Sequence, residues 1–179
     1  MESNLFRLLY KAGYVTEGNN KVVETGIKRI KHFMQDIGLA LAVGCLLKSI
    51  GVSVVMEMVY LPLRCYSGGY HASSEKVCKY LSWGSIVGCL AVIRYVPIPV
   101  YLQHLLMLVS VVCIPVFAPV ESPNKPLYER EKRVFRRISL VITAVAVFCY
   151  GGTVLFGADV YAKTICMAVV MVWGGLILD

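Results

Sequence analysis

The sequence predicts an all-α fold: a polytopic membrane helical bundle with about four to six membrane-embedded segments and an N-terminal amphipathic helix. Of the 179 residues, 58% are hydrophobic and only 16% are charged, against about 25% in average soluble chains. The surplus of apolar side chains must therefore face lipid. The net charge of +7 is gathered mainly in two basic segments that flank apolar runs. These observations exclude an ordinary soluble domain and a disordered or fibrous chain, and they predict one integral membrane domain over residues 1–179.

The first basic segment, residues 1–36, contains most of the amphipathic helix. Between residues 22 and 37 apolar side chains recur at helical spacing, with basic side chains on the other faces. The apolar stripe consists of Val23, Ile27, Ile30, Met34 and Ile37. Such a helix can lie in the headgroup plane of anionic lipid or pack on the protein's own core, and the sequence leaves both open. The N-terminus lacks the pattern of a signal peptide, which is a short basic region followed by an apolar stretch and a cleavage site of small residues. We therefore expect no cleaved signal peptide.

Apolar stretches dominate the rest of the chain and are the candidates for membrane-embedded helices. They cover residues 37–63, 80–93, 95–120, 138–158 and 160–178. The first stretch is interrupted near Gly51, which indicates a hairpin or re-entrant pair; alternatively, one stretch lies at the interface. A tight turn at residues 157–159 separates the last two.

The positions of the basic residues predict the orientation of the chain. Lys and Arg favour the cytoplasmic side, so residues 1–34 and 121–137 should share it, with an even number of crossings between them. A hairpin of 80–93 and 95–120 then returns the polar segment 64–79 to the side of residues 121–137. Because the second basic run lies between apolar spans, it indicates membrane anchoring and not a nucleic-acid partner.

The seven cysteines do not form a recognisable disulfide or metal pattern. Their number is odd, and the chain has neither a CxxC motif nor a Cys/His cluster of zinc spacing. Most of them lie inside apolar runs, namely Cys45, Cys89, Cys113, Cys149 and Cys166. We expect these to be small buried hydrophobic residues, all cysteines to be free thiols, and no metal or cofactor to be bound.

The polar segment 64–79 brings a nucleophile and a base close together in sequence. Ser73 or Ser74 can cap a helix, which places Cys78 one turn inside that helix and His71 just ahead of the cap. A thiol with a pKa of about 8.5 needs a base beside it to act as a nucleophile at neutral pH. His71 is the available base, and the alternative is a surface histidine that happens to lie near an inert cysteine.

Two further residues make that pairing feasible, and one competes with it. Gly68 and Gly69 supply the unhindered backbone that a bend of His71 over the helix requires. Cys65 is the alternative nucleophile, but no clear helix start lies behind it. The sequence therefore favours Cys78.

The arrangement Arg64, Gly68-Gly69-Tyr70-His71-Ala72 and Cys78 resembles the signature of the AgrB family, the membrane cysteine peptidases of Gram-positive quorum sensing. A second similar block, residues 118–127, precedes a basic run, so the resemblance extends over nearly the whole chain. It implies that His71 is the general base and Cys78 the nucleophile, with Arg64 and Gly69 at essential positions and Gly68 in support.

The resemblance also implies a substrate and a location. The family removes the C-terminal part of an AgrD-type pro-peptide and closes the remainder into a thiolactone or lactone autoinducer precursor. We therefore expect a multi-pass protein in the cell membrane of a Gram-positive bacterium, a homodimer in contact with the lipid bilayer, with its active site toward the cytoplasm and no cofactor.

Several roles stay open at this stage. The group that orients His71 could be Glu75, Glu57 or Asp36. The oxyanion could be stabilised by backbone N–H groups near Gly69 or the helix start, or by Arg64.

The second basic segment offers a substrate-binding surface. AgrD-type substrates are similar in having an acidic C-terminal tail, which cations could hold; the alternative is a role in topology alone. The candidate cations are Lys125, Arg130, Lys132, Arg133, Arg136 and Arg137.

Two other function classes compete with a peptidase. Intramembrane polar residues can mark a substrate path, so Lys48, Glu57, Arg94 and His104 suggest a small multi-pass transporter or export subunit. No inverted repeat supports that interpretation. A non-catalytic membrane scaffold is the third class, for which the His71 and Cys78 pair would be irrelevant.

Overall fold

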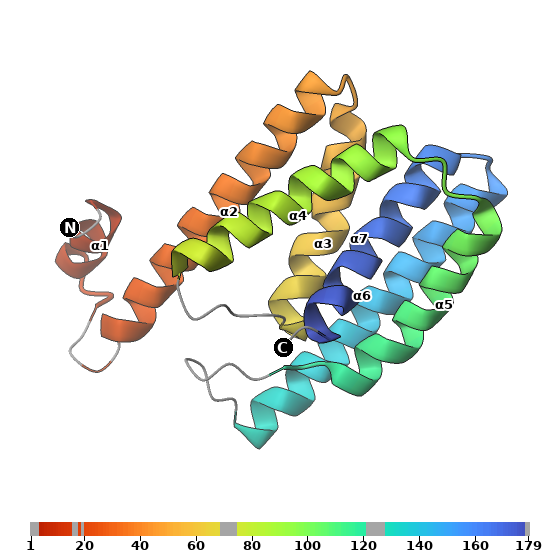
Figure 1. Ribbon diagram of the computed structural model, residues 1–179. Helices are drawn as coiled ribbons and strands as arrows, with labels where there is room; N and C mark the ends of the chain where they lie inside the picture. The colour runs from red at the N-terminus through yellow and green to blue at the C-terminus, as the bar shows by residue number, and fades with distance from the viewer. Residues whose placement is uncertain (1–3, 16–17, 19, 69–74, 121–127, 178–179) are drawn as a thin grey trace. The chain divides into compact units, whose positions relative to one another are not determined.

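A computed structural model of the chain describes residues 4–15, 18, 20–68, 75–120 and 128–177. Within these ranges every regular element is a helix (Figure 1). The helices are α1 (Asn4–Lys11), α2 (Asn20–Leu46), α3 (Ile50–Ser67), α4 (Glu75–Tyr95), α5 (Val100–Phe117), α6 (Glu129–Leu155) and α7 (Asp159–Ile177). The predicted all-α class is confirmed.

The chain divides into two compact units, Met1–Gly38 and Leu39–Asp179. In the first unit the predicted amphipathic helix forms the N-terminal part of α2. An exposed ion pair one turn apart, Lys28 Nζ to Glu24 Oε1 at 2.9 Å, lies on its polar side. On the apolar stripe Ile30 and Met34 are exposed, so this unit presents an apolar surface beside its cations.

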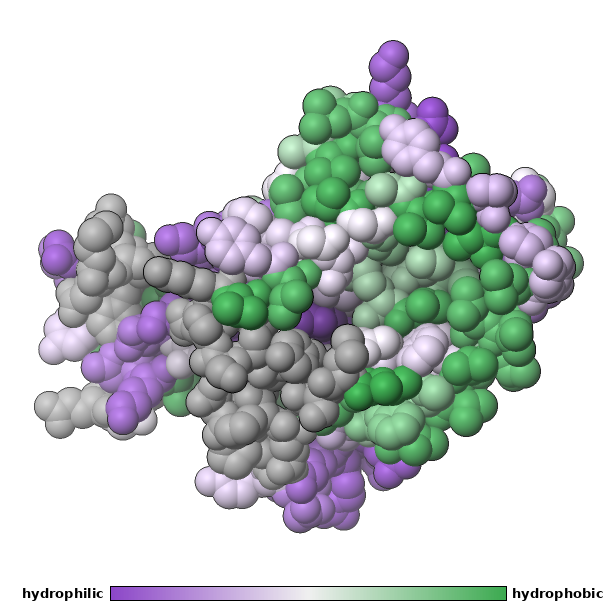
Figure 2. All heavy atoms as spheres, in the orientation of Figure 1, coloured by the Kyte–Doolittle hydropathy of each residue, from purple (hydrophilic) through white to green (hydrophobic). Residues whose placement is uncertain are grey.

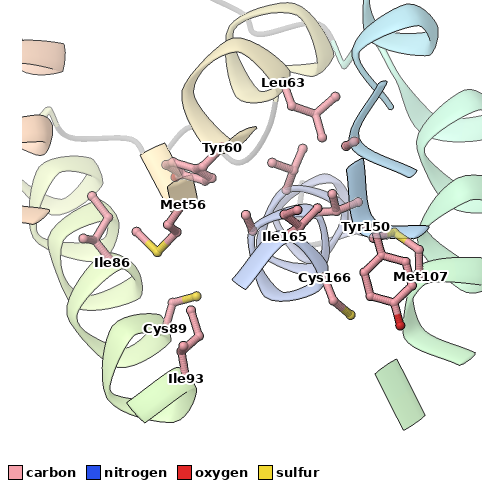
Figure 3. Close-up of a cluster of buried hydrophobic side chains, with 14 of the residues drawn as sticks. Met56, Tyr60, Leu63, Ile86, Cys89, Ile93, Met107, Tyr150, Ile165 and Cys166 are labelled. Atoms are coloured by element: carbon pink, nitrogen blue, oxygen red, sulfur yellow. The ribbon is translucent and has the colours of Figure 1, made fainter. Parts of the chain in front are cut away.

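The second unit is a helical bundle with α7 at its centre. α7 packs against α3, α4, α5 and α6. Its inward side chains include Ile165 and Cys166, which face side chains from the surrounding helices (Figure 3). Met56 and Tyr60 of α3 join this core and are almost fully buried.

Among the helices that the structure describes, three are long and apolar enough to cross a membrane: α5, α6 and α7. Large apolar side chains on the outer faces of α5 and α6 are exposed, among them Leu105, Leu108 and Phe148. Figure 2 shows hydrophobic atoms gathered over α5. Such a surface suits hydrocarbon, where the helices satisfy their own backbone hydrogen bonds.

The interruption predicted near Gly51 is real. α2 ends at Leu46 and α3 begins at Ile50, and Lys48 between them has a φ of 52°. A left-handed backbone at a residue other than glycine is uncommon and ends the helix here. The first apolar stretch is therefore a helix–turn–helix.

The cysteine prediction is partly wrong. The six described cysteines are free thiols, and Cys89 and Cys166 are buried as expected. Cys45 and Cys149 are instead exposed. Because outward positions of a membrane bundle are also apolar, an apolar run does not tell which of its residues face inward. The side chain of Cys78 lies outside the described residues.

Candidate active site

The candidate catalytic segment connects the end of α3 to the start of α4. α4 begins at Glu75, so Cys78 is its fourth residue and lies in the first turn. This agrees with the helix start predicted from Ser73 and Ser74. The first four N–H groups of a helix have no partner within it and carry a partial positive charge. His71, Gly69 and the side chains of Glu75 and Cys78 lie outside the described residues.

Gly68 ends α3 in a conformation that favours glycine. Its φ is 79° and its ψ is −152°, and its N–H donates to the carbonyl of Arg64. A Cβ at this position would lie 2.8 Å from the carbonyl oxygen of Val120. The backbone of Val120 therefore approaches so closely that a larger residue cannot fit without a shift. The rest of the bend predicted for Gly68 and Gly69 lies outside the described residues.

The second similar block meets the first at this point. The N–H of Val120 donates to the carbonyl of Ser67 at 3.1 Å. From α6, Phe135 packs edge-on against Tyr66 with ring centroids 5.6 Å apart. The end of α3, the chain after α5 and the first turns of α6 thus lie together at one end of the bundle. The sequence predicts that the segments 64–79 and 121–137 share one side of the membrane, and their described flanks lie at the same end of the bundle.

Arg64 lies one helical turn before Gly68, in the last turn of α3. Its guanidinium carbon is 5.7 Å from the centroid of the Tyr60 ring. A Cβ at Gly175 would lie 3.5 Å from Nη1 of Arg64, so the side chain rests against the last turns of α7. A half-buried cation is therefore held between α3 and α7, four residues before Gly68.

The predicted substrate-binding cations lie on the first turns of α6. Arg130, Arg133, Arg136 and Arg137 are exposed and Lys132 is partly exposed. Lys132 forms an ion pair of 3.0 Å with Glu129. Exposed pairs of this kind contribute little to stability, so these side chains form a solvent-facing basic surface. Lys125 lies outside the described residues.

The open candidates for a third catalytic group fall in different places. Glu57 is buried, with 6% of its surface exposed, and lies about 15 Å along α3 from Ser67. Asp36 belongs to the other compact unit. Cys65 lies in the last turn of α3 and is exposed, so it belongs to the C-terminal end of a helix and not to a helix start.

Of the polar residues that suggested a transporter, His104 has a local hydrogen-bond role. His104 Nδ1 is 2.7 Å from the hydroxyl of Tyr150. Sequence reasoning overlooked Lys163, whose ammonium group donates to the carbonyls of Ile93 and Val96 at the end of α4. It also overlooked Ser67, because nothing in the sequence distinguishes this serine from the others.

Comparison with known proteins decides the family. The family model described as accessory gene regulator B matches residues 3–178. The chain belongs to the AgrB family. This AgrB protein is accordingly a membrane protein of agr autoinducer processing, and the resemblance noted from its motifs is confirmed. No curated protein matches the chain, and no solved structure does.

Proposed function

We propose that this AgrB protein is a membrane-embedded cysteine endopeptidase. It removes the C-terminal part of an AgrD-type pro-peptide and cyclises the remainder into a thiolactone or lactone autoinducer precursor. The main support is the position of Cys78 in the first turn of α4, close in sequence to a histidine that follows the constrained glycine Gly68. The partial positive charge of a helix N-terminus favours a thiolate there.

The reaction runs in two steps. The Cys78 thiolate attacks a substrate carbonyl, and the His71 imidazolium protonates the departing amine, which leaves an acyl-enzyme thioester. A cysteine or serine within the bound peptide then attacks that thioester and gives its proton to the neutral His71, which closes the ring and releases the Cys78 thiolate. For a cysteine this exchanges one thioester for another of similar energy, so ring closure needs no ATP. Unpaired N–H groups of the α4 first turn, or Arg64, stabilise the oxyanion.

Substrate recognition relies on charge. The basic surface at the start of α6 binds the acidic C-terminal tail of the pro-peptide, and the described contacts place α6 beside the end of α3 through Tyr66 and Phe135. Both segments face the cytoplasm of a Gram-positive bacterium in this proposal, and the enzyme is a homodimer in the cell membrane. The apolar surroundings of the bundle exclude water, which would otherwise hydrolyse the acyl-enzyme.

Co-expression with an AgrD-type pro-peptide tests the activity. Cleavage products are identified by mass, and each variant is first shown to reach the membrane at wild-type abundance. We expect Cys78→Ala and His71→Ala to abolish cleavage because the nucleophile and base act as a unit. The matched control, Cys65→Ala, should retain most activity. Cleavage by Cys78→Ala at the wild-type rate would refute the assignment of Cys78 as the nucleophile. If the wild-type protein produced no cleavage, the transporter and scaffold classes would remain.

A further inference from the structure

A buried pair of serines joins the end of α3 to α6. The hydroxyl oxygens of Ser67 and Ser139 are 2.9 Å apart, and the two residues are 0% and 1% exposed. Ser67 is the last residue of α3 and directly precedes Gly68. A hydrogen bond between buried groups is costly to lose when only one partner is removed. We call this pair the serine latch.

The serine latch is accompanied by other described contacts that hold the last turn of α3. Next to it, the carbonyl of Ser67 accepts the N–H of Val120 at 3.1 Å. Tyr66 packs its ring edge-on against Phe135 of α6. Ser67 is therefore held by its side chain on α6 and by its main chain on the segment after α5.

We propose that the serine latch positions the catalytic segment. The hydrogen bond fixes the direction in which the chain leaves α3 and so sets the starting point of the segment that leads to His71. The proposal rests on the proposed peptidase function and adds positioning residues to it, since neither serine needs to touch substrate. Displacement of a catalytic group by about 1 Å can lower a rate about 100-fold, so a contact at this point controls the rate of the chemical step.

A positioning role and a purely stabilising role predict different results for the variant in which both serines are replaced by alanine. Ser67→Ala or Ser139→Ala alone leaves one buried hydroxyl unpaired, which lowers stability under either role. Replacing both serines removes both polar groups, and such a change can be nearly neutral for stability. A purely stabilising latch therefore predicts that the double variant recovers both stability and activity. A positioning latch predicts that stability recovers and activity does not.

The test compares Ser67→Ala, Ser139→Ala and the double variant with Ser110→Ala. Ser110 is equally buried, but its hydroxyl donates within its own helix to the carbonyl of Leu106, so this variant controls for the loss of a buried hydroxyl. Purified full-length proteins in nanodiscs are compared by melting temperature, by kcat and KM for an AgrD-type pro-peptide, and by hydrogen exchange of the peptide that carries Val120.

The double variant distinguishes a positioning role of the serine latch from a purely stabilising one. We expect wild-type melting temperature and KM, a kcat lower by about tenfold or more, and amide exchange at Val120 faster by about tenfold. Ser110→Ala should match the wild type in all four quantities. A double variant with wild-type kcat, or with Val120 as protected as in the wild type, would overturn the serine latch. If wild-type protein does not cleave the pro-peptide, the proposed function fails, and the exchange at Val120 still decides whether the latch holds the segment.

Discussion

Replacement of Gly68 by alanine is the sharpest structural perturbation of the candidate site. The residue has a φ of 79° and a ψ of −152°, a region that only glycine adopts without cost. Alanine there costs about 1–3 kcal/mol in backbone strain. The new methyl group would also lie 2.8 Å from the carbonyl oxygen of Val120 and 3.3 Å from its nitrogen, so one of the two segments must move.

Relief of that overlap disrupts the hydrogen bond from Val120 to Ser67, worth about 0.5–1.5 kcal/mol. Together with the strain, the expected loss in the free energy of unfolding is about 2–4 kcal/mol. The catalytic segment begins at this residue, so cleavage of the pro-peptide should fall at least as steeply as stability.

The assay compares Gly68→Ala with Gly151→Ala by denaturant or thermal unfolding in detergent and by pro-peptide cleavage. Gly151 lies within α6 and a Cβ there meets nothing within 4 Å, so alanine should leave the protein unchanged or stabilise it by about 0.5–1 kcal/mol. If Gly68→Ala were as stable and as active as Gly151→Ala, the close approach of Val120 and the role assigned to it would be wrong.

Three further predictions concern topology, substrate binding and packing. In a cysteine-poor background, Ser74→Cys and Ser122→Cys should be labelled from the same, cytoplasmic side of intact cells; labelling from opposite sides would contradict the topology. Reversing Arg133 and Arg136 to Glu should raise KM for the pro-peptide more than it lowers kcat, and wild-type binding should weaken with salt because exposed charges are screened over about 8–10 Å. Unchanged affinity of this correctly folded variant at low salt would eliminate the tail-binding role. Lys163→Met should lower the free energy of unfolding by about 1–3 kcal/mol, since it removes charged hydrogen bonds to the end of α4; an unchanged melting temperature would show that this contact carries no stability.

Local signals in the sequence account for much of the fold. The polar and glycine residues around Gly51 predict the break between α2 and α3, and Ser73 and Ser74 predict the start of α4 at Glu75. Both features depend on a few neighbouring residues, whose capping and backbone preferences act over one turn. The basic segments likewise predict that the end of α3 and the start of α6 lie at the same end of the bundle.

Contacts between distant segments could not be predicted in this way. Ser67 and Ser139 are 72 residues apart, and a serine in an apolar helix gives no sign of its partner. The exposure of Cys45 and Cys149 was missed for a related reason: lipid and protein core are both apolar, so hydropathy does not separate the two faces of a membrane helix. The burial of the Glu57 side chain in the middle of α3 became apparent only from the packed bundle.

The most direct test of the central claim is to trap the acyl-enzyme. Purified protein in nanodiscs is incubated with an AgrD-type pro-peptide whose ring-closing cysteine or serine is replaced by alanine, so that the thioester cannot be resolved by cyclisation. Peptide mapping by mass spectrometry should find the N-terminal part of the substrate, less one water, attached to Cys78, and no adduct in His71→Ala. An adduct on Cys65, or cleavage that proceeds with no adduct on any cysteine, would contradict the assignment of Cys78 as the nucleophile.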